Sequence, residues 1–188
     1  MVSLHYTITK KDYINFYTYV MWDAGDKRRK RAKDILKQFG FVALFIIVFY
    51  TVGGFRYLTK TSIIIILAMF GTSFLPILGG RSNAEKEAEE IADDPDNAGV
   101  FLPTIFTAAE NGITVKTDIA DIKYAWKAIV RKTETGNYFY LFPNAMQALI
   151  VPKNAFATAQ DLAAFQKLLS MNLSLEADLK EDIINAGE

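Results

Sequence analysis

Two long apolar runs without charges constrain the fold of this chain more than any other feature of its sequence. No residue between Lys37 and Arg56, or between Lys60 and Arg81, carries a charge. A run of roughly 18 or more such residues is long enough to cross a bilayer as a helix. We therefore expect a two-helix transmembrane hairpin over residues 39–80 and a lipid bilayer as its partner. The expected spans of this hairpin cover about 39–57 and 62–80.

The charges that flank the two runs predict how the hairpin is oriented. Seven lysines and arginines lie between residues 27 and 37, whereas the segment between the two uncharged runs has two, Arg56 and Lys60. Positive charge favours the cytoplasmic side, so we expect a multi-pass protein of the inner (plasma) membrane with both termini in the cytoplasm. A basic run can also bind nucleic acid, but its position beside a span accounts for it, and no nucleic-acid partner is expected. The candidate membrane-surface and topology residues are Lys27, Arg28, Arg29, Lys30, Arg31 and Lys33.

The N-terminal segment, residues 1–38, predicts a strand followed by an amphipathic helix and the basic region. Apolar and polar residues alternate from Val2 to Thr9, a pattern typical of a half-buried strand. Thr9 is a suitable N-cap, with Asp12 in the first turn of the helix. The apolar face of this helix is rich in aromatic residues and either packs on a sheet or, together with Trp22, lies at the membrane interface. The residues of this face are Tyr13, Phe16, Tyr17 and Val20.

Side chains suited to catalysis or metal binding are scarce. The chain has no cysteine, and His5 is its only histidine. A lone histidine on the polar face of a strand is more often a surface residue than a metal ligand or base. The two apolar runs also lack the ionisable residues that ion and proton pathways use. We therefore expect no enzyme activity, no catalytic residues, no metal and no cofactor.

The C-terminal part predicts a small antiparallel β domain closed by a helix. Residues 81–99 form an expected acidic linker in which Ser82 or Asn83 caps a short helix. The β domain covers residues 100–170, and a polar tail covers 171–188. The fold class is therefore an α+β membrane protein. The expected elements are a first strand at Val100–Ala108, a hairpin at Asn111-Gly112, a central strand apolar on both faces at Asn137–Phe142, and a helix that Thr158 caps and that runs to Leu169.

Short motifs in this part of the chain resemble a known family. They are Asn111-Gly-Ile-Thr-Val, Trp126-Lys-Ala-Ile129, Tyr138-Phe-Tyr-Leu141 and Ile150-Val-Pro-Lys153, followed by Phe156. In order and spacing they resemble the C-terminal domain of YcxB-like proteins, which are bacterial membrane proteins without an assigned molecular function. The resemblance implies an N-terminal strand and an aromatic helix ahead of two transmembrane helices. The motif residues, with expected structural roles, are Trp126, Ile129, Tyr138, Pro152, Lys153 and Phe156.

The same domain looks like a small pleckstrin-homology-like sheet with a C-terminal helix. Val2–Thr9 is expected to join this sheet, so that the hairpin is an insertion into one folded unit. Trp126 is expected in the core with a partner for its indole N–H. Lys153 either contacts a lipid phosphate or is a solvated lysine.

The functional hypothesis is a cytoplasmic binding or regulatory module for a protein, a peptide or a lipid headgroup. It depends on the basic cluster beside the membrane, the aromatic-rich sheet and the lack of catalytic residues. The alternatives are a structural component of a membrane complex that self-associates through the hairpin, and a non-catalytic transporter subunit. The expected partner, besides the bilayer, is a protein or a second copy of the chain.

Overall fold

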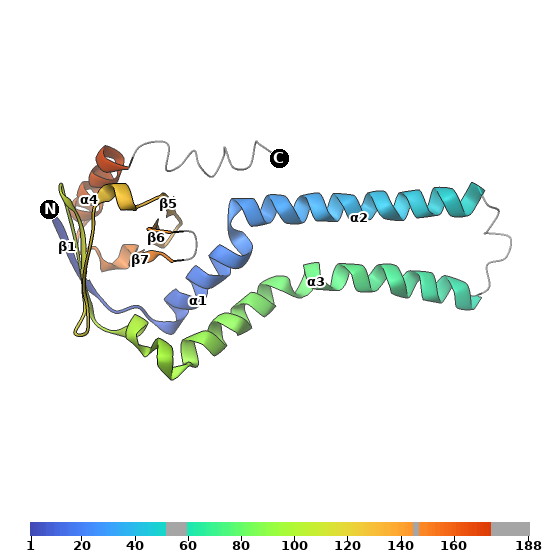
Figure 1. The fold of residues 1–188 in the computed structure, drawn as a ribbon, viewed down its shortest axis with the longest axis horizontal. Helices are drawn as coiled ribbons and strands as arrows, with labels where there is room; N and C mark the ends of the chain where they lie inside the picture. The colour runs from blue at the N-terminus through green and yellow to red at the C-terminus, as the bar shows by residue number, and fades with distance from the viewer. Residues whose placement is uncertain (52–59, 145–146, 174–188) are drawn as a thin grey trace. The chain divides into compact units, whose positions relative to one another are not determined.

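The computed structural model describes residues 1–51, 60–144 and 147–173 (Figure 1). The chain forms two compact units, one of Met1–Tyr17 with Glu87–Glu188 and the other of Thr18–Lys86. The first unit contains the strands, and the second is helical. The end of the first expected span and part of the segment between the spans (52–59), and most of the expected polar tail (174–188), lie outside the described residues.

The first unit contains a four-stranded antiparallel sheet, here called sheet A. Its strands follow the order β1-β2-β3-β4. Val2 of β1 lies opposite Ala108 of β2, and Tyr6 lies opposite Thr104. The expectation that the N-terminal strand joins the C-terminal sheet is therefore confirmed. The strands are β1 (Val2–Tyr6), β2 (Thr104–Ala109), β3 (Gly112–Lys116) and β4 (Asp121–Tyr124).

The expected first strand of the C-terminal domain begins too early. Val100 and Phe101 belong instead to a 3₁₀ helix, η3 (Pro95–Phe101). Proline is favoured in the first turn of a helix, and the Asp94 carboxylate accepts a hydrogen bond from the Asp96 N–H at 2.9 Å. These local interactions prevail over the apolar pattern, and β2 begins only at Thr104.

The second sheet, sheet B, has three antiparallel strands in the order β5-β6-β7. All residues of the middle strand β6 are buried, which confirms the expectation of a central strand apolar on both faces. Phe139 and Leu141 belong to the hydrophobic core that also includes residues of sheet A. The strands are β5 (Arg131–Glu134), β6 (Tyr138–Phe142) and β7 (Leu149–Pro152), and two short 3₁₀ helices flank the sheet in sequence, η4 (Trp126–Ala128) and η5 (Lys153–Ala155).

The C-terminal helix α4 (Ala159–Asn172) completes the core of the first unit. As expected, Thr158 caps it: its hydroxyl accepts a hydrogen bond from the Asp161 N–H at 3.1 Å. Phe165 is fully buried. Its ring centroid lies 5.8 Å from that of Phe106 in sheet A and 5.3 Å from that of Phe139 in sheet B. One side chain of α4 therefore contacts both sheets.

Helix α1 (Lys10–Thr18) packs against sheet B through aromatic side chains. Its first turn is capped by Thr9, whose hydroxyl accepts from the Asp12 N–H at 3.2 Å. The Phe16 ring centroid lies 5.4 Å from that of Tyr140 and 6.3 Å from that of Phe142. For Phe16, which is buried, the interpretation as part of a core face is therefore confirmed.

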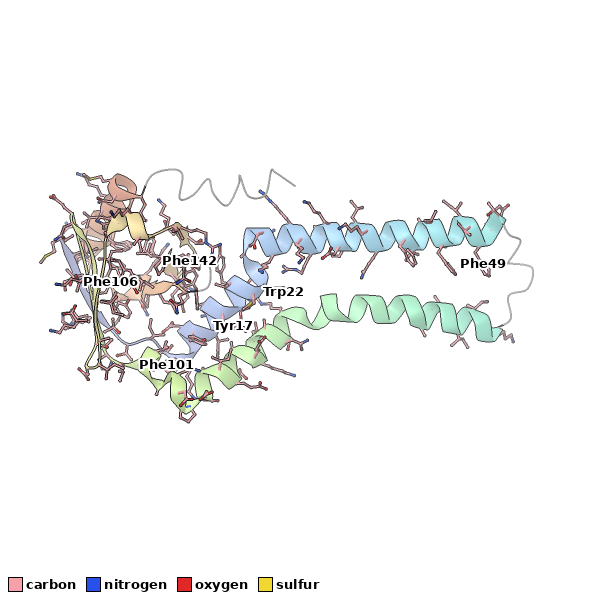
Figure 2. All side chains as sticks on the ribbon, in the orientation of Figure 1. Tyr17, Trp22, Phe49, Phe101, Phe106 and Phe142 are labelled. Carbon is pink, nitrogen blue, oxygen red and sulfur yellow. The ribbon has the colours of Figure 1, made fainter. Side chains whose placement is uncertain are left out.

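In the described part of the second unit the chain forms three helical segments. They are the π-helical turn η1 (Tyr19–Asp23), α2 (Gly25–Thr51), and the part of α3 (Lys60–Asp93) that extends to Lys86. Among the described residues one helix, α2, is long and apolar enough to cross a membrane. Large apolar side chains such as Leu44 and Ile47 are exposed along it, and Figure 2 shows side chains projecting from α2 as far as Phe49.

Helix α3 corrects the expectation for the acidic segment. Residues 81–93 do not start a new helix capped by Ser82 or Asn83 but continue α3 without a break. Alanine and glutamate have high helix propensity, so a helix that enters this segment is readily continued. Ala88 and Ala92, one turn apart, are buried in the first unit. The end of α3 therefore packs as part of that unit and is not a solvated linker.

Candidate functional site

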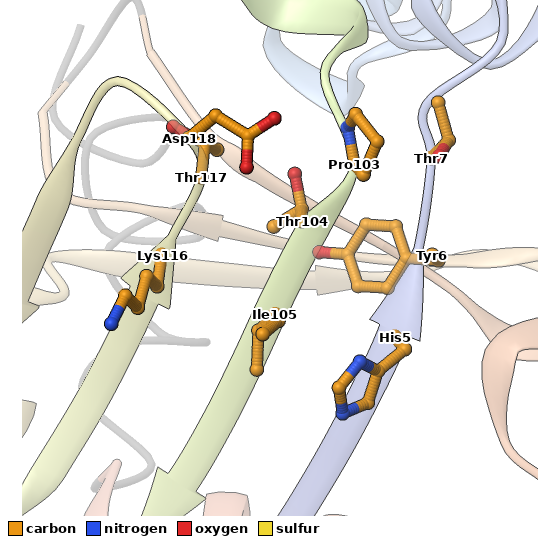
Figure 3. A pocket seen from close by; sticks show the side chains of 9 residues that line it. All are labelled: His5, Tyr6, Thr7, Pro103, Thr104, Ile105, Lys116, Thr117 and Asp118. Atoms are coloured by element: carbon orange, nitrogen blue, oxygen red, sulfur yellow. The ribbon is translucent and has the colours of Figure 1, made fainter.

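A pocket of about 430 Å³ lies where three strands of sheet A end or begin. We call it the strand-end pocket; Figure 3 shows its side chains. All its lining residues belong to the first unit. They come from the end of β1, the start of β2, and the end of β3 with the turn that follows: His5, Tyr6, Thr7, Pro103, Thr104, Ile105, Lys116, Thr117 and Asp118.

The register of sheet A places two nitrogen-bearing side chains on either side of an apolar one. His5 lies opposite Ile105, and Ile105 lies opposite Lys116. Directly opposed residues project from the same face of a sheet, and all three are exposed, so this is the outer face (Figure 3). Neighbouring strands are about 4.8 Å apart, which separates the His5 and Lys116 backbones by roughly 10 Å. An anionic group above Ile105 would therefore lie between His5 and Lys116.

The other polar groups shape the pocket rather than add a reactive centre. The Thr104 hydroxyl donates to the Leu102 carbonyl at 3.0 Å. The Tyr6 hydroxyl donates to the Ile150 carbonyl at 2.9 Å, and burial raises the pKa of this tyrosine. Asp118 supplies a carboxylate from the turn between β3 and β4. The Tyr6 and Thr104 hydroxyl protons are therefore already used within the protein, and the donors open to a polar ligand are those of His5 and Lys116.

Sequence reasoning identifies only part of this pocket. His5 is exposed, as a surface residue on the polar face of a strand should be. Nothing in the local pattern marks Lys116 or Asp118, and neither residue is predicted from the sequence. They come close to His5 only through the pairing of β1 with β2 and of β2 with β3. The one available signal is the polar Lys-Thr-Asp segment that ends an apolar run.

The basic cluster lies on the first turns of α2 in the second unit. Arg31 is half-buried, and its guanidinium lies 3.8 Å from the centroid of the Trp22 ring. A cation over an aromatic face is a stabilising contact, so Arg31 also positions Trp22. The other five residues of the cluster are exposed: Lys27, Arg28, Arg29, Lys30 and Lys33.

The motif residues Trp126 and Ile129 are part of the hydrophobic core. The Trp126 indole N–H donates to the Ala109 carbonyl at 2.8 Å, which is the partner expected for a buried tryptophan. The Ile129 N–H donates to the Trp126 carbonyl at 3.0 Å and closes the 3₁₀ turn. These two residues fix the connection between β4 and β5.

The motif residues that follow β6 stabilise sheet B. Pro152 is buried and lies opposite Tyr138 in the β6–β7 pair. The Lys153 ammonium forms an ion pair with Glu134 at 2.7 Å and lies 4.9 Å from the Phe139 ring centroid. Lys153, the first residue of η5, is thus held by contacts with sheet B, which corrects the expectation of a solvated lysine. Phe156 packs its ring 5.3 Å from that of Phe165.

A polar network joins α1 to sheet B through Tyr138. The Tyr138 hydroxyl donates to the Asp12 carboxylate at 2.6 Å and accepts from the Asn15 side chain at 3.0 Å. The Thr9 hydroxyl and N–H donate to the same carboxylate at 2.7 and 2.8 Å. Burial by itself raises the pKa of Asp12, but the hydrogen bonds from Tyr138 and Thr9 outweigh it and hold the pKa below its usual value.

The network predicts a loss of stability in acid that depends on Asp12. A carboxyl group whose pKa is lowered by folding stabilises the fold above its unfolded pKa of about 4, and this contribution is lost as the pH falls through the lower folded-state value. We expect Asp12→Asn to lower the free energy of unfolding at pH 7 by about 1–2 kcal/mol, because solvent partly screens these charged hydrogen bonds. The variant should also flatten the decline in stability as the pH falls below about 4.

The measurement is urea unfolding of the full chain in a neutral detergent, followed by Trp126 fluorescence in a Trp22→Phe background. Asp96→Asn, a change at an exposed position of η3, is the control and should leave both the stability at pH 7 and the acid decline unchanged. Equal acid profiles for Asp12→Asn and the parent chain would contradict the role of Asp12.

The described part of the chain has no group of three or more histidine, aspartate or glutamate side chains placed to hold a metal ion. Residues 109–169 match the family model of the YcxB-like protein. This match confirms the resemblance drawn from the sequence motifs, and it covers β3 to β7 and most of α4. No curated protein and no solved structure matches the chain.

Proposed function

We propose that this chain, which carries a YcxB-like domain, is a membrane-anchored binding module that recognises an anionic lipid headgroup in the strand-end pocket. The observation that carries the proposal is the placement of His5 and Lys116 on either side of Ile105 on the outer face of sheet A. A headgroup phosphate accepts hydrogen bonds from lysine and histidine, and the apolar Ile105 suits the glycerol and acyl carbons next to the phosphate. The proposed activity is binding without catalysis.

The anchor is proposed to be a helical hairpin in a bacterial inner membrane. Helix α2 supports the first span, because its apolar window has no residue buried within the structure. Helix α3 includes the second apolar run, Ser62–Gly80, as continuous helix, which supports the second span. The excess of basic residues before the first span favours both termini in the cytoplasm. Under this topology the strand-end pocket is on the cytoplasmic side.

The domain is proposed to be pleckstrin-homology-like. A four-stranded sheet, a three-stranded sheet and a C-terminal helix supply its core. The two sheets are joined in sequence through η4, and α4 contacts both through Phe165. This arrangement supports the analogy in fold. The choice of ligand depends on the pocket, since a fold does not set a function.

The proposed function predicts that Lys116→Ala weakens headgroup binding. The probe is dihexanoyl phosphatidylglycerol, a short-chain anionic lipid, titrated calorimetrically into the full chain in a neutral detergent. A hydrogen bond to a charged group contributes about 1.5–3 kcal/mol, so the dissociation constant should rise about tenfold or more. Dihexanoyl phosphatidylcholine, which has no net charge, should bind more weakly to the parent chain.

Lys127→Ala is the matched control, because Lys127 is an exposed lysine of the same unit that does not line the pocket. Anionic lipid that binds the basic cluster of α2 contributes equally to both variants, so the difference between them isolates the pocket. Identical titrations for Lys116→Ala and Lys127→Ala would refute the proposed site. Binding of inorganic phosphate as tight as that of the lipid would identify a free anion as the ligand instead.

A further inference from the structure

Strand β4 is an exposed edge of sheet A. Sheet order places β4 at the end of the sheet, next to β3 alone. Its residues Asp121, Ile122 and Lys123 are exposed, and Ile122 retains 44% of its accessible surface. No described strand pairs with its other side. An edge of this kind can pair with a further strand, and natural proteins usually protect it with charges.

The hydrogen-bond pattern identifies which backbone groups of β4 point away from the sheet. The Thr117 N–H donates to the Ala120 carbonyl at 2.8 Å, so these two residues form a hydrogen-bonded pair. Hydrogen-bonded and non-hydrogen-bonded pairs alternate along antiparallel strands. Ile122 therefore directs its N–H and C=O toward β3, whereas Asp121 and Lys123 direct theirs outward.

We propose that β4 pairs antiparallel with β4 of a second copy of this chain, so that two copies of sheet A form one continuous sheet. The pairing is centred on Ile122, which lies opposite Ile122 of the second copy. Asp121 then lies opposite Lys123 of the second copy, and Lys123 opposite its Asp121. The outward N–H and C=O groups of Asp121 and Lys123, which do not bond to β3, form the new hydrogen bonds.

Charge complementarity selects this register. A two-fold axis perpendicular to the sheet pairs residues whose side chains lie on the same face. The two residue numbers of each opposed pair are therefore both odd or both even. Centring on Asp121 would place two carboxylates opposite each other, and centring on Lys123 would place two ammonium groups opposite each other. Like charges directly opposite destabilise a strand pair, whereas opposite charges stabilise it. Only the register centred on Ile122 pairs both charges of β4 with their opposites.

The interface is self-complementary in its apolar groups as well. Ile122 of each copy covers the other, because a non-hydrogen-bonded pair brings the two Cα atoms to about 4.5 Å. Ile119, in the turn before β4, is 74% exposed and lies near the same edge. The partner is therefore a second copy of the chain, and it binds along the edge of β4 rather than at the strand-end pocket or through the hairpin.

The first test uses disulfide cross-linking in the full chain, which has no cysteine of its own. Ile122→Cys should form a disulfide-linked dimer under mild oxidation, because the expected Cα separation of about 4.5 Å suits a disulfide. Ile105→Cys is the matched control. Ile105 has a similar exposure, 39%, but lies on β2 inside sheet A. It should remain free of cross-links under the same conditions.

The second test exchanges the charges. In the Ile122→Cys background, Asp121→Lys alone and Lys123→Asp alone should each reduce the cross-linked fraction about tenfold or more, since each creates two like-charge pairs. The double exchange, Asp121→Lys with Lys123→Asp, should restore it. A mixture of the two single variants should also restore it, as a heterodimer, because one copy then carries two lysines and the other two aspartates.

Restoration in the mixture would exclude a folding defect as the cause of the lost cross-linking, because two misfolded variants would not cross-link with each other. The proposal would be overturned by equal cross-linking of Ile105→Cys and Ile122→Cys, by charge exchanges that leave the cross-linked fraction unchanged, or by a monomeric mass of the parent chain in detergent at the concentration used for cross-linking.

Discussion

Replacing Gly112 with alanine is expected to lower the free energy of unfolding by about 3 kcal/mol or more. Gly112 opens β3 after the turn that follows β2, and its φ of 143° lies in a region that other residues rarely adopt. A Cβ atom at this position would lie 2.3 Å from the Tyr124 carbonyl oxygen. The change therefore adds backbone strain to a clash with a backbone atom that β3–β4 pairing holds in place.

The effect is measured by urea unfolding of the full chain in a neutral detergent, with Trp126 as the only tryptophan in a Trp22→Phe background. Trp126 is a suitable reporter, because its indole bonds to Ala109 at the same turn. Gly136→Ala is the control: a Cβ there meets no atom within 4 Å, and no positive φ is required. It should change the stability by less than about 1 kcal/mol. If Gly112→Ala also changed the free energy of unfolding by less than about 1 kcal/mol, β3 and β4 could move apart at this point without destabilising the fold.

The sequence predicts the elements of this fold well where a local pattern and a capping residue agree. The alternation from Val2, the cap at Thr158 and the doubly apolar run at Asn137–Phe142 each correspond to an observed element. In each case the pattern and the burial depend on the same residues. The prediction that β1 joins the C-terminal sheet also holds, since a lone half-buried strand needs a partner for its backbone.

The sequence is less informative where the outcome depends on long-range contacts. The acidic segment after Arg81 has the composition of a linker, yet it continues α3, because Ala88 and Ala92 find a packing surface. The partner of Lys153 is Glu134, which lies on a strand whose place in sheet B no local pattern reveals. A prediction from neighbouring residues alone therefore leaves this lysine in solvent.

The candidate site shows the same limit more clearly. His5 and Lys116 are far apart in sequence and become neighbours only through a register in which Ile105 lies opposite both. A shift of one residue would turn one of them toward the core. The register is set by the buried residues of the other face, such as Leu4 and Phe106, so the core fixes the geometry of the polar face.

Replacing Phe165 with alanine is expected to lower the free energy of unfolding by about 3–5 kcal/mol. The ring is fully buried and packs against Phe106 of sheet A and Phe139 of sheet B. Its removal leaves a cavity at the point where α4 contacts both sheets. A rigid core of aromatic rings can collapse only partly around such a cavity, so the loss should lie at the upper part of the range for large-to-small changes.

Two further variants determine whether packing is the cause. Phe165→Leu keeps most of the apolar volume and should lower the free energy of unfolding by less than about 1.5 kcal/mol. Phe156→Ala removes a ring that also contacts Phe165, at 5.3 Å, but is only half-buried, so its effect should be intermediate. The loss in the free energy of unfolding should therefore decrease in the order Phe165→Ala, Phe156→Ala, Phe165→Leu. It is measured by the same urea titration, followed by Trp126 fluorescence. If Phe156→Ala proved more destabilising than Phe165→Ala, the link between the sheets would pass through η5 and its neighbours rather than through α4.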